Sequence, residues 1–209
     1  KYHLDKLNKC QKKNINLIQI FENEIRLFPQ IVISRLKSIL NLQKYKIYAK
    51  KCTVKEIDKK LKNKFLTKYH LQGTTSSQIN LGLFYKNRLV SVMTFSKPRV
   101  ALGRRKPLEN TFELSRYCTN FNFHFVGGAS KLLSSFENNY KPQTIFSYAD
   151  KRWSNGNLYL KLGFDLIKHS QPNYWYFFKN GEFKIYHRFN FRKQVLEKKL
   201  EKFDNNLTE

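Results

Sequence analysis

A serine, a tyrosine and an aspartate follow an apolar run at Ser147, Tyr148 and Asp150, in the segment SYADKRWSNGNLYLKLGF. A carboxylate at a strand end could orient an amine or accept its proton, with the hydroxyls hydrogen-bonding beside it. Further along, Tyr159 carries a phenol, and a phenol with an ordinary pKa near 10 can donate a proton to a departing anion. These four residues are the candidate catalytic groups.

Two of these assignments have structural alternatives. Asp150 could cap the turn that follows it, because short carboxylates often accept backbone N–H groups locally. Tyr159 could pack its ring on a short amphipathic helix and leave its hydroxyl in water.

The chain is strongly basic, with 40 Lys and Arg against 15 Asp and Glu and a formal net charge of +25. The charge is spread along the chain, since residues 1–64 carry a net +12 and residues 65–209 a net +13. Such a field favours an anionic partner, usually nucleic acid or an acidic membrane surface. An AT-rich genome would also enrich lysine, so the charge alone is not specific.

The composition bounds the class of protein. Hydrophobic residues make up 41% of the chain, with 18 Phe and 12 Tyr, which excludes global disorder. The three cysteines are scattered and the five histidines lack metal-ligand spacing, which favours a reducing compartment and no structural zinc. No apolar run approaches a membrane span and no signal peptide is evident, so we expect a cytoplasmic protein. The chain begins at Lys1 without a methionine, as a fragment of a longer protein would.

The first 45 residues predict helix, strand and helix, with the strand at Ile15–Phe21 and the second helix beginning near Pro29. This stretch resembles the C-terminal end of very-short-patch-repair-like nucleases of the PD-(D/E)xK class, which phage homing-type endonucleases often carry. Glu22 and Glu24 are its only local candidates for binding a divalent metal, which would be needed only if an upstream nuclease site exists. The alternative is that they are solvated residues at the start of a loop.

From residue 46 the pattern predicts a strand, an amphipathic helix and then a β-rich part. Asn80–Tyr85 and Leu89–Phe95 form a hairpin around a turn at residues 86–88, and a strand follows at 111–120. A glycine turn then enters a helix over 128–140, followed by a strand ending near Asp150, a helix near 155–164 and a last pair of strands. A Lys/Glu-rich helix closes the chain from Arg192.

Two motifs in this part resemble the GNAT fold of acyl-CoA-dependent N-acyltransferases, over about residues 50–190. One is HFVGGAS at His124–Ser130, where the family binds the CoA pyrophosphate on a glycine turn that opens a helix; His124 replaces the usual Gln or Arg. The other is NGNLYLKLGF at Asn155–Phe164, in which the family's tyrosine, here Tyr159, protonates the CoA thiolate. The resemblance implies acetyl-CoA or a related acyl-CoA as cofactor. The implied cofactor-binding residues are Val126, Gly127, Gly128, Ala129, Ser130 and Asn155.

The segment SYADKRWSNGNLY, together with FELSRYC and its Arg116, resembles the Mom-like branch, phage proteins that modify adenine in DNA with an acyl-CoA-derived group. Arg152, Trp153 and Ser154 stand where that branch has a glycine- and histidine-containing turn. The resemblance implies double-stranded DNA as partner and a phage-infected bacterial cell as setting. Trp153 could stack on an extruded base, or it could lie in the core against the strand at 174–178.

The basic loop Lys97–Lys106 could clamp a DNA backbone or remain solvated. The expected nucleic-acid-binding residues are Lys97, Arg99, Arg104, Arg105, Lys106, Arg116, Arg152 and Trp153.

We therefore expect an α+β chain with a GNAT-like mixed central sheet flanked by helices, preceded by the partial nuclease-like helix-strand-helix segment. The expected domains are residues 1–45, 46–192 and a tail at 193–209. The expected function is that of a phage-type, homing-endonuclease-associated DNA-binding protein whose GNAT-like domain transfers an acyl-derived group to a base. The alternatives are a non-catalytic DNA-recognition module and an ordinary GNAT acting on a small amine or protein; the oligomeric state is left open.

Overall fold

The computed structural model describes residues 2–43, 45–98, 109–121, 123–177, 183, 185–204 and 206. By its internal contacts the chain forms two compact units. Unit 1 combines Lys1–Leu27 with Ile167–Glu209, and unit 2 is Phe28–Leu166.

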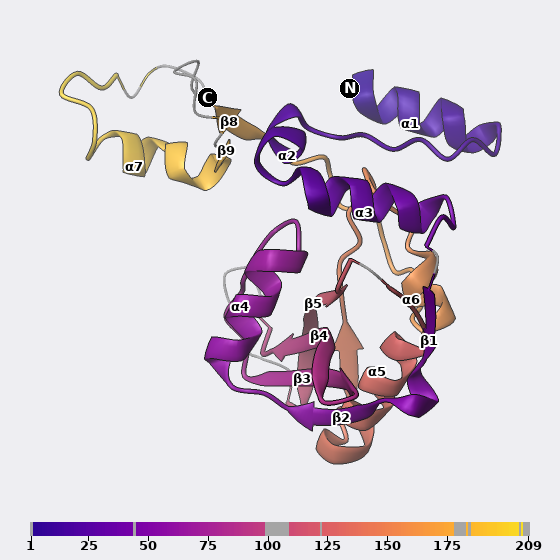
Figure 1. The fold of residues 1–209 in the computed structure, drawn as a ribbon. Coiled ribbons are helices and arrows are strands. Elements are labelled where there is room, and N and C mark those ends of the chain that lie inside the picture. Colours follow the sequence, from indigo (N-terminus) through magenta and orange to yellow (C-terminus); the bar gives the residue numbers. More distant parts are fainter. Residues whose placement is uncertain are drawn as a thin grey trace. The chain divides into compact units, whose positions relative to one another are not determined.

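Unit 2 is built on a five-stranded mixed sheet in the order β2-β3-β4-β5-β7 (Figure 1). Its strands are β2 (Thr53–Glu56), β3 (Ile79–Tyr85), β4 (Arg88–Ser96), β5 (Thr111–Thr119) and β7 (Thr144–Phe146). All neighbours are antiparallel except β5 and β7, which are parallel. A separate parallel pair joins β1 (Tyr45–Tyr48) to β6 (Phe123–Val126). The hairpin, the strand at 111–120 and the α+β class are confirmed.

The helices of unit 2 flank this sheet, with α4 and α5 on opposite sides (Figure 1). The elements are α3 (Pro29–Ile39), η1 (Ala49–Lys51), α4 (Lys59–Tyr69), α5 (Gly128–Tyr140) and α6 (Asn157–Lys161). The carboxylate of Asp58 caps α4 by accepting the Leu61 N–H at 2.7 Å. Gly127 begins α5 with a φ of +76°, a conformation that favours glycine. Both helix starts follow local sequence signals.

The side chains of the sheet alternate between two faces. On the α5 face, Leu81, Met93, Phe95 and Leu114 join the main core cluster, and the ring of Phe95 stacks on Phe136 of α5 with centroids 3.6 Å apart. The register places Gly82, Val92, Thr94, Arg116 and Cys118 on the other side, which we call the α4 face. Among the described residues, the buried apolar cluster on this face consists of Phe65, Leu66 and Val92, with partly buried side chains such as Ile57 and Leu89 packed against it.

Unit 1 contains α1 (Tyr2–Lys12), α2 (Glu22–Leu27), the antiparallel pair β8 (Trp175–Phe177) and β9 (Ile185–His187), η3 (Arg188–Phe191) and α7 (Lys193–Leu196). The strand expected at Ile15–Phe21 is wrong, because this run pairs with no strand in the described residues; Phe21 instead contacts Trp175 edge-to-face at 6.1 Å. The C-terminal helix is also shorter than expected.

The compact units divide the chain at other positions than the expected boundary near residue 45. Helix α3 belongs to unit 2, since Ile31 and Val32 are buried and the Arg35 guanidinium lies over the Trp153 ring at 4.6 Å. The last strands belong with the N-terminal segment rather than with the sheet of unit 2. Among the described residues, no helix combines the length and apolar character needed to cross a membrane.

Candidate functional site

The parallel strands β5 and β7 separate in the middle of unit 2. They pair only over Thr111–Glu113 and Thr144–Phe146, although β5 runs on to Thr119. The register between β4 and β5 also shifts here: Thr94 pairs with Arg116 while Phe95 pairs with Leu114. Ser115 is therefore the extra residue of a β-bulge, a feature that is over-represented beside active sites.

Two of the four predicted catalytic side chains, those of Ser147 and Tyr159, meet where the strands separate, whereas Tyr148 contributes only its carbonyl group and its side chain is exposed. Ser147 Oγ donates to the Leu114 carbonyl oxygen at 2.8 Å and lies 3.1 Å from the Tyr159 hydroxyl. The Tyr159 hydroxyl also lies 3.4 Å from the carbonyl oxygen of Tyr148. The ring of Tyr159 is set by an edge-to-face contact with Phe164 at 5.6 Å. Its oxygen is thus held by polar neighbours rather than buried in the core.

Asp150, the fourth predicted residue, stabilises the turn in which it lies. One carboxylate oxygen accepts the Arg152 backbone N–H at 3.0 Å, and the other pairs with the Arg152 guanidinium at 2.7 Å. The Asp150 carbonyl also accepts the N–H groups of Trp153 and Ser154. This is the capping role that the sequence left open as the alternative, and it engages both carboxylate oxygens.

Trp153 is 3% exposed, and its ring is covered by Arg35 of α3. A buried ring cannot stack on an extruded base without a rearrangement, so the structure corrects that expectation. The core alternative fits better, although the partner here is α3 rather than the strand at 174–178.

The predicted cofactor-binding turn is partly exposed. Gly127 and Ser130 face solvent and Val126 is 37% exposed, whereas Gly128 and Ala129 are buried. A Cβ atom at Gly128 would lie 3.2 Å from Phe125 Cβ, a tight contact that a larger residue could keep only if Phe125 shifted slightly. The first turn of α5 can still present backbone N–H groups and its positive dipole end to an anion. Asn155 is exposed at the start of the segment that leads into α6.

The predicted nucleic-acid-binding residues that the structure describes make separate local contacts. Lys97 is exposed, Arg152 pairs with Asp150, and Arg116 donates to the carbonyls of Ser115 at 2.7 Å and Gly73 at 3.4 Å. Arg99, Arg104, Arg105 and Lys106 lie outside the described residues.

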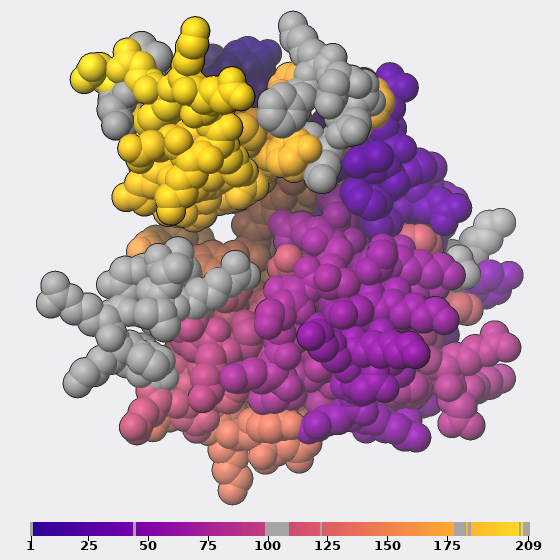
Figure 2. Space-filling view, turned by 90° about the vertical axis from the view of Figure 1, so that its left-hand side faces the viewer, coloured from indigo at the N-terminus to yellow at the C-terminus, as the bar shows by residue number. Residues whose placement is uncertain are grey.

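A basic row on α4 escaped the sequence analysis. Lys60, Lys64 and Lys68 are exposed and four residues apart, so they lie along one side of the helix. This side of unit 2 faces the viewer in Figure 2. The four-residue lysine spacing was the signal that could have revealed it.

Glu113 also escaped notice. It is 6% exposed on β5, two residues before the bulge. An acidic residue inside a predicted strand was the available signal, because strands seldom bury a carboxylate without a reason.

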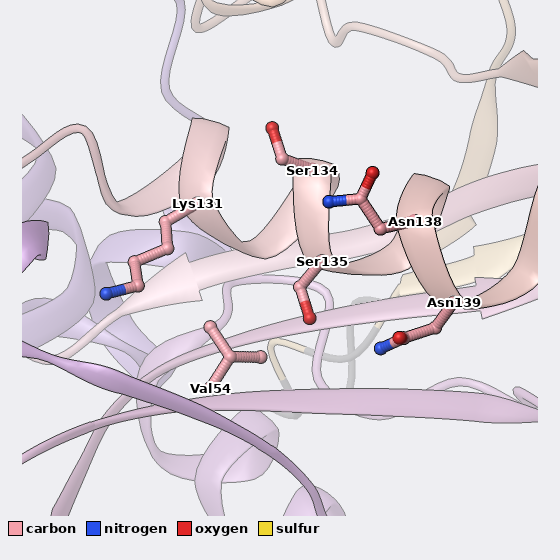
Figure 3. A pocket seen from close by; sticks show the side chains of 6 residues that line it. All are labelled: Val54, Lys131, Ser134, Ser135, Asn138 and Asn139. Carbon is pink, nitrogen blue, oxygen red and sulfur yellow. The ribbon is translucent and has the colours of Figure 1, made fainter.

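A hollow of about 360 Å³ lies between α5 and Val54 (Figure 3). Ser135 points toward Val54, while Ser134 points away from it (Figure 3). The Lys131 ammonium group donates to the carbonyls of Ala49 and Cys52 at 2.9 and 2.5 Å. The one charged group of this hollow therefore serves to fasten η1 to α5.

The described residues contain no group of three or more His, Cys, Asp or Glu side chains placed to hold a metal ion. Glu22 pairs with Arg26 at 3.1 Å, and Glu24 accepts the Phe21 N–H at 3.1 Å. Both expected nuclease candidates thus open α2, a short helix rather than a loop.

Comparison with known proteins gives distant structural matches. No protein-family model matches the sequence, and no curated protein is significantly similar to it. A GNAT-family acetyltransferase from Streptococcus pneumoniae TIGR4 matches with a TM-score of 0.41 and 15% identity, over 56% of this chain and 89% of its own. A ribosomal-protein-alanine N-acetyltransferase from Brucella melitensis biovar Abortus 2308 matches with a TM-score of 0.40 and 13% identity, over 58% and 96%.

An aminoglycoside acetyltransferase from an uncultured soil metagenomic sample, solved with sisomicin, matches with a TM-score of 0.35 and 16% identity, over 76% of this chain and 92% of its own. Similarity at these levels does not by itself establish an activity for this chain.

Proposed function

We propose that unit 2 is a GNAT-like acyltransferase domain that moves an acyl group from an acyl-CoA thioester to an amine of DNA. The observation that carries the proposal is the separation of β5 from β7 at a bulge, with the Tyr159 hydroxyl 3.1 Å from Ser147 at that point. The strand order and the glycine turn into α5 agree with the GNAT-like pattern in the sequence.

Each residue of the site would have a separate task. The acyl-CoA would supply the activated acyl group, with its phosphates at Gly127 and Ser130 on the first turn of α5. Tyr159 would donate a proton to the departing sulfur, and Ser147 would hold the phenol in position. Glu113 would accept the proton lost by the amine. Asp150 would shape the loop that follows Tyr148.

DNA is the acceptor that the charge supports. An ordinary GNAT acting on a small amine or a protein does not need a net charge of +25. The exposed row Lys60, Lys64 and Lys68 adds a surface that can follow phosphates. A Mom-like reaction on adenine is the specific form of the proposal; the link to a homing endonuclease stays a prediction.

A non-catalytic DNA-recognition module is the second candidate. It is favoured by the burial of Gly128 and Ala129, which leaves only part of the expected phosphate-binding turn accessible. In this alternative Tyr159 packs against Phe164, and the bulge is a structural feature of β5.

Calorimetric titration of acetyl-CoA into the purified chain tests the first candidate. Gly128 is buried, so a large residue there would disturb the packing; the informative variant is Ser130→Glu, which puts a negative charge at the exposed start of α5. A glutamate there stabilises the helix, so weaker binding would report repulsion of phosphates rather than unfolding. Ser134→Glu, exposed one turn later, is the matched control.

We expect acetyl-CoA to bind the wild type and Ser134→Glu, and to bind Ser130→Glu about tenfold more weakly, a difference of about 1.4 kcal/mol. Mass spectrometry of nucleosides from DNA treated with the protein and acetyl-CoA would then identify the modified base. If acetyl-CoA does not bind and DNA does, the recognition module is the correct account. If neither binds, both candidates fail.

A further inference from the structure

A cavity of about 220 Å³ lies on the α4 face of unit 2, away from Tyr159. Its lining comes from α3, from the last residues of α4 and from the end of β5. The volume is below the range of roughly 300–1,000 Å³ typical of drug-sized ligands, so the cavity suits a single ring system. None of the candidate catalytic, cofactor-binding or nucleic-acid-binding residues named from the sequence lines it.

Aromatic side chains form one side of this cavity. Tyr69 and Phe121 line it and contact each other edge-to-face, with ring centroids 4.8 Å apart. The rings of Tyr69 and Phe121 offer surfaces on which a flat ligand can stack. Tyr117 borders the cavity from β5, but its ring packs against the main core on the α5 face.

Two polar groups in the lining could bind a ligand by hydrogen bonds, one as an acceptor and the other as a donor. Gln43 Oε1 is buried and accepts no hydrogen bond from any described residue. Buried amide oxygens nearly always have a donor, so this acceptor is available to a donor group of a ligand. His70 Nδ1 accepts the Gln72 N–H at 3.1 Å, which leaves Nε2 to carry the proton of the neutral ring.

The charge around the cavity restricts the ligand further. Burial and the nearby guanidinium groups of Arg116 and Arg35 lower the pKa of His70 to about 3, so the ring stays neutral in neutral solution. No carboxylate is among the lining residues. A positively charged amine would therefore be repelled, whereas an uncharged ring attached to phosphates would be attracted.

A path for those phosphates adjoins the cavity. Lys60, Lys64 and Lys68 run along the exposed side of α4, and this helix ends at Tyr69 in the cavity wall. Eight residues of helix span about 12 Å at 1.5 Å per residue. The row is thus long enough to contact more than one phosphate of a strand whose base enters the cavity.

We propose that this cavity binds one unstacked base of a nucleic-acid strand. Gln43 Oε1 accepts a hydrogen bond from an amino or ring N–H group of the base, and His70 Nε2–H donates to a neighbouring ring nitrogen or carbonyl oxygen. The proposal rests on the proposed nucleic-acid function and deepens it, because it gives unit 2 a base-binding site separate from Tyr159. Cys118 of β5 lines the cavity and is three residues from the bulge at Ser115, so the cavity lies about 10 Å along β5 from the place where the strands separate, at 3.3 Å per residue.

The test compares two single strands of equal length, a mixed-sequence oligonucleotide and a tetrahydrofuran-spacer strand that keeps the phosphates and lacks the bases. Fluorescence anisotropy measures the affinity of the full chain for each. The variant is Gln43→Leu, which keeps the side-chain volume and removes the acceptor. The matched control is Gln30→Leu, an exposed glutamine on α3.

We expect the wild type and Gln30→Leu to prefer the base-containing strand, and Gln43→Leu to lose about tenfold of that preference while binding the spacer strand unchanged. A second variant, Ser38→Trp, fills the mouth of the cavity from the exposed side of α3 and should have the same effect without touching the buried core.

The two levels of the proposal fail differently. If the wild type binds neither strand, the nucleic-acid function is wrong and the cavity proposal falls with it. If the wild type binds both strands equally, or if Gln43→Leu and Ser38→Trp both leave the preference intact, the cavity proposal alone is overturned.

Discussion

On the α5 face of the unit 2 sheet, β4 presents Met93 and Phe95 to α5, whereas on the α4 face the same strand presents Val92 and Thr94. The α5 face is apolar and closely packed, with fully buried Leu132 and Phe136 opposite it.

The α4 face holds polar groups and the base-sized cavity. Lys62, buried at 1% exposure, donates to Thr75 O and Ser77 Oγ at 2.6 and 3.1 Å, and Arg116 reaches Gly73 O. These bonds fasten the loop before β3 over the sheet. The α5 face therefore contributes most of the apolar packing. The α4 face has fewer apolar contacts and instead holds hydrogen-bond donors and acceptors in position.

The largest expected effect is on the α5 face. Phe136→Ala removes a ring that stacks on Phe95 and contacts Phe112 edge-to-face at 5.2 Å. The variant should lose about 3–5 kcal/mol of unfolding free energy, as buried phenylalanines do. Urea denaturation followed by circular dichroism measures the loss, and Asn139→Ala, exposed on the same helix, should change stability by under about 0.5 kcal/mol. A loss for Phe136→Ala as small as that of the control would mean that the α5 face is not the main source of stability.

At the place where β5 and β7 separate, Tyr159→Phe should lower the rate of acyl transfer and leave the free energy of unfolding nearly unchanged. Tyr159 is half-buried, so water can satisfy Ser147 when the phenol oxygen is removed and stability should change by no more than about 1 kcal/mol. Proton donation to the departing thiolate, by contrast, should be lost. Proton transfer typically contributes at least about 100-fold, equivalent to about 2.7 kcal/mol of barrier.

A thiol reagent measures CoA release from acetyl-CoA in the presence of DNA, and Tyr148→Phe is the control because its exposed hydroxyl takes no part in these contacts. An unchanged rate in Tyr159→Phe would remove Tyr159 from the mechanism.

The sequence predicted the elements whose signals are local. The hairpin turn uses Lys86 and Asn87 at positive φ, and Gly127 begins α5 at a position that the glycine turn had marked. The predicted grouping of Ser147 with Tyr159 is also observed, because both lie within one short segment.

Contacts between distant segments could not be predicted. Arg35 covers Trp153, and Arg116 reaches Gly73, 43 residues earlier. The apolar run Ile15–Phe21 looked like a strand because periodicity alone cannot show whether a partner strand exists. The cavity escaped notice for the same reason, since Gln43, His70 and Cys118 come together only in the fold.

On the α4 face, His70 should make the free energy of unfolding depend on pH in the acidic range. Its pKa is lowered to about 3 in the folded chain, against about 6.5 when unfolded, so the unfolded chain binds one more proton between these values. Stability is therefore lost as the pH falls from about 6.5 toward 3, by about 2 kcal/mol at pH 5.

His70→Asn, which keeps an acceptor for Gln72 N–H and cannot titrate in this range, should show a shallower loss than the wild type when urea denaturation is repeated from pH 7 to pH 5. His169→Asn, an exposed histidine, is the control. Parallel curves for the wild type and His70→Asn would show that His70 is not held neutral by its surroundings.

The smallest effect has the opposite sign and tests the comparison most directly. Thr94 is fully buried on the α4 face, and its Oγ1 has no hydrogen-bond partner among the described residues. Thr94→Val replaces the hydroxyl by a methyl group of similar size and should raise the unfolding free energy by about 1 kcal/mol, since an unsatisfied buried hydroxyl costs about 1–3 kcal/mol.

Ser91, equally buried on the same strand but facing α5, donates to the Cys118 carbonyl at 2.9 Å, so Ser91→Ala should lower stability by about 1 kcal/mol. Opposite signs for the two substitutions in urea denaturation would support the view that the α4 face sacrifices stability for polar groups. A loss in both would mean that Thr94 Oγ1 is satisfied in solution, and that the α4 face is as well stabilised as the α5 face.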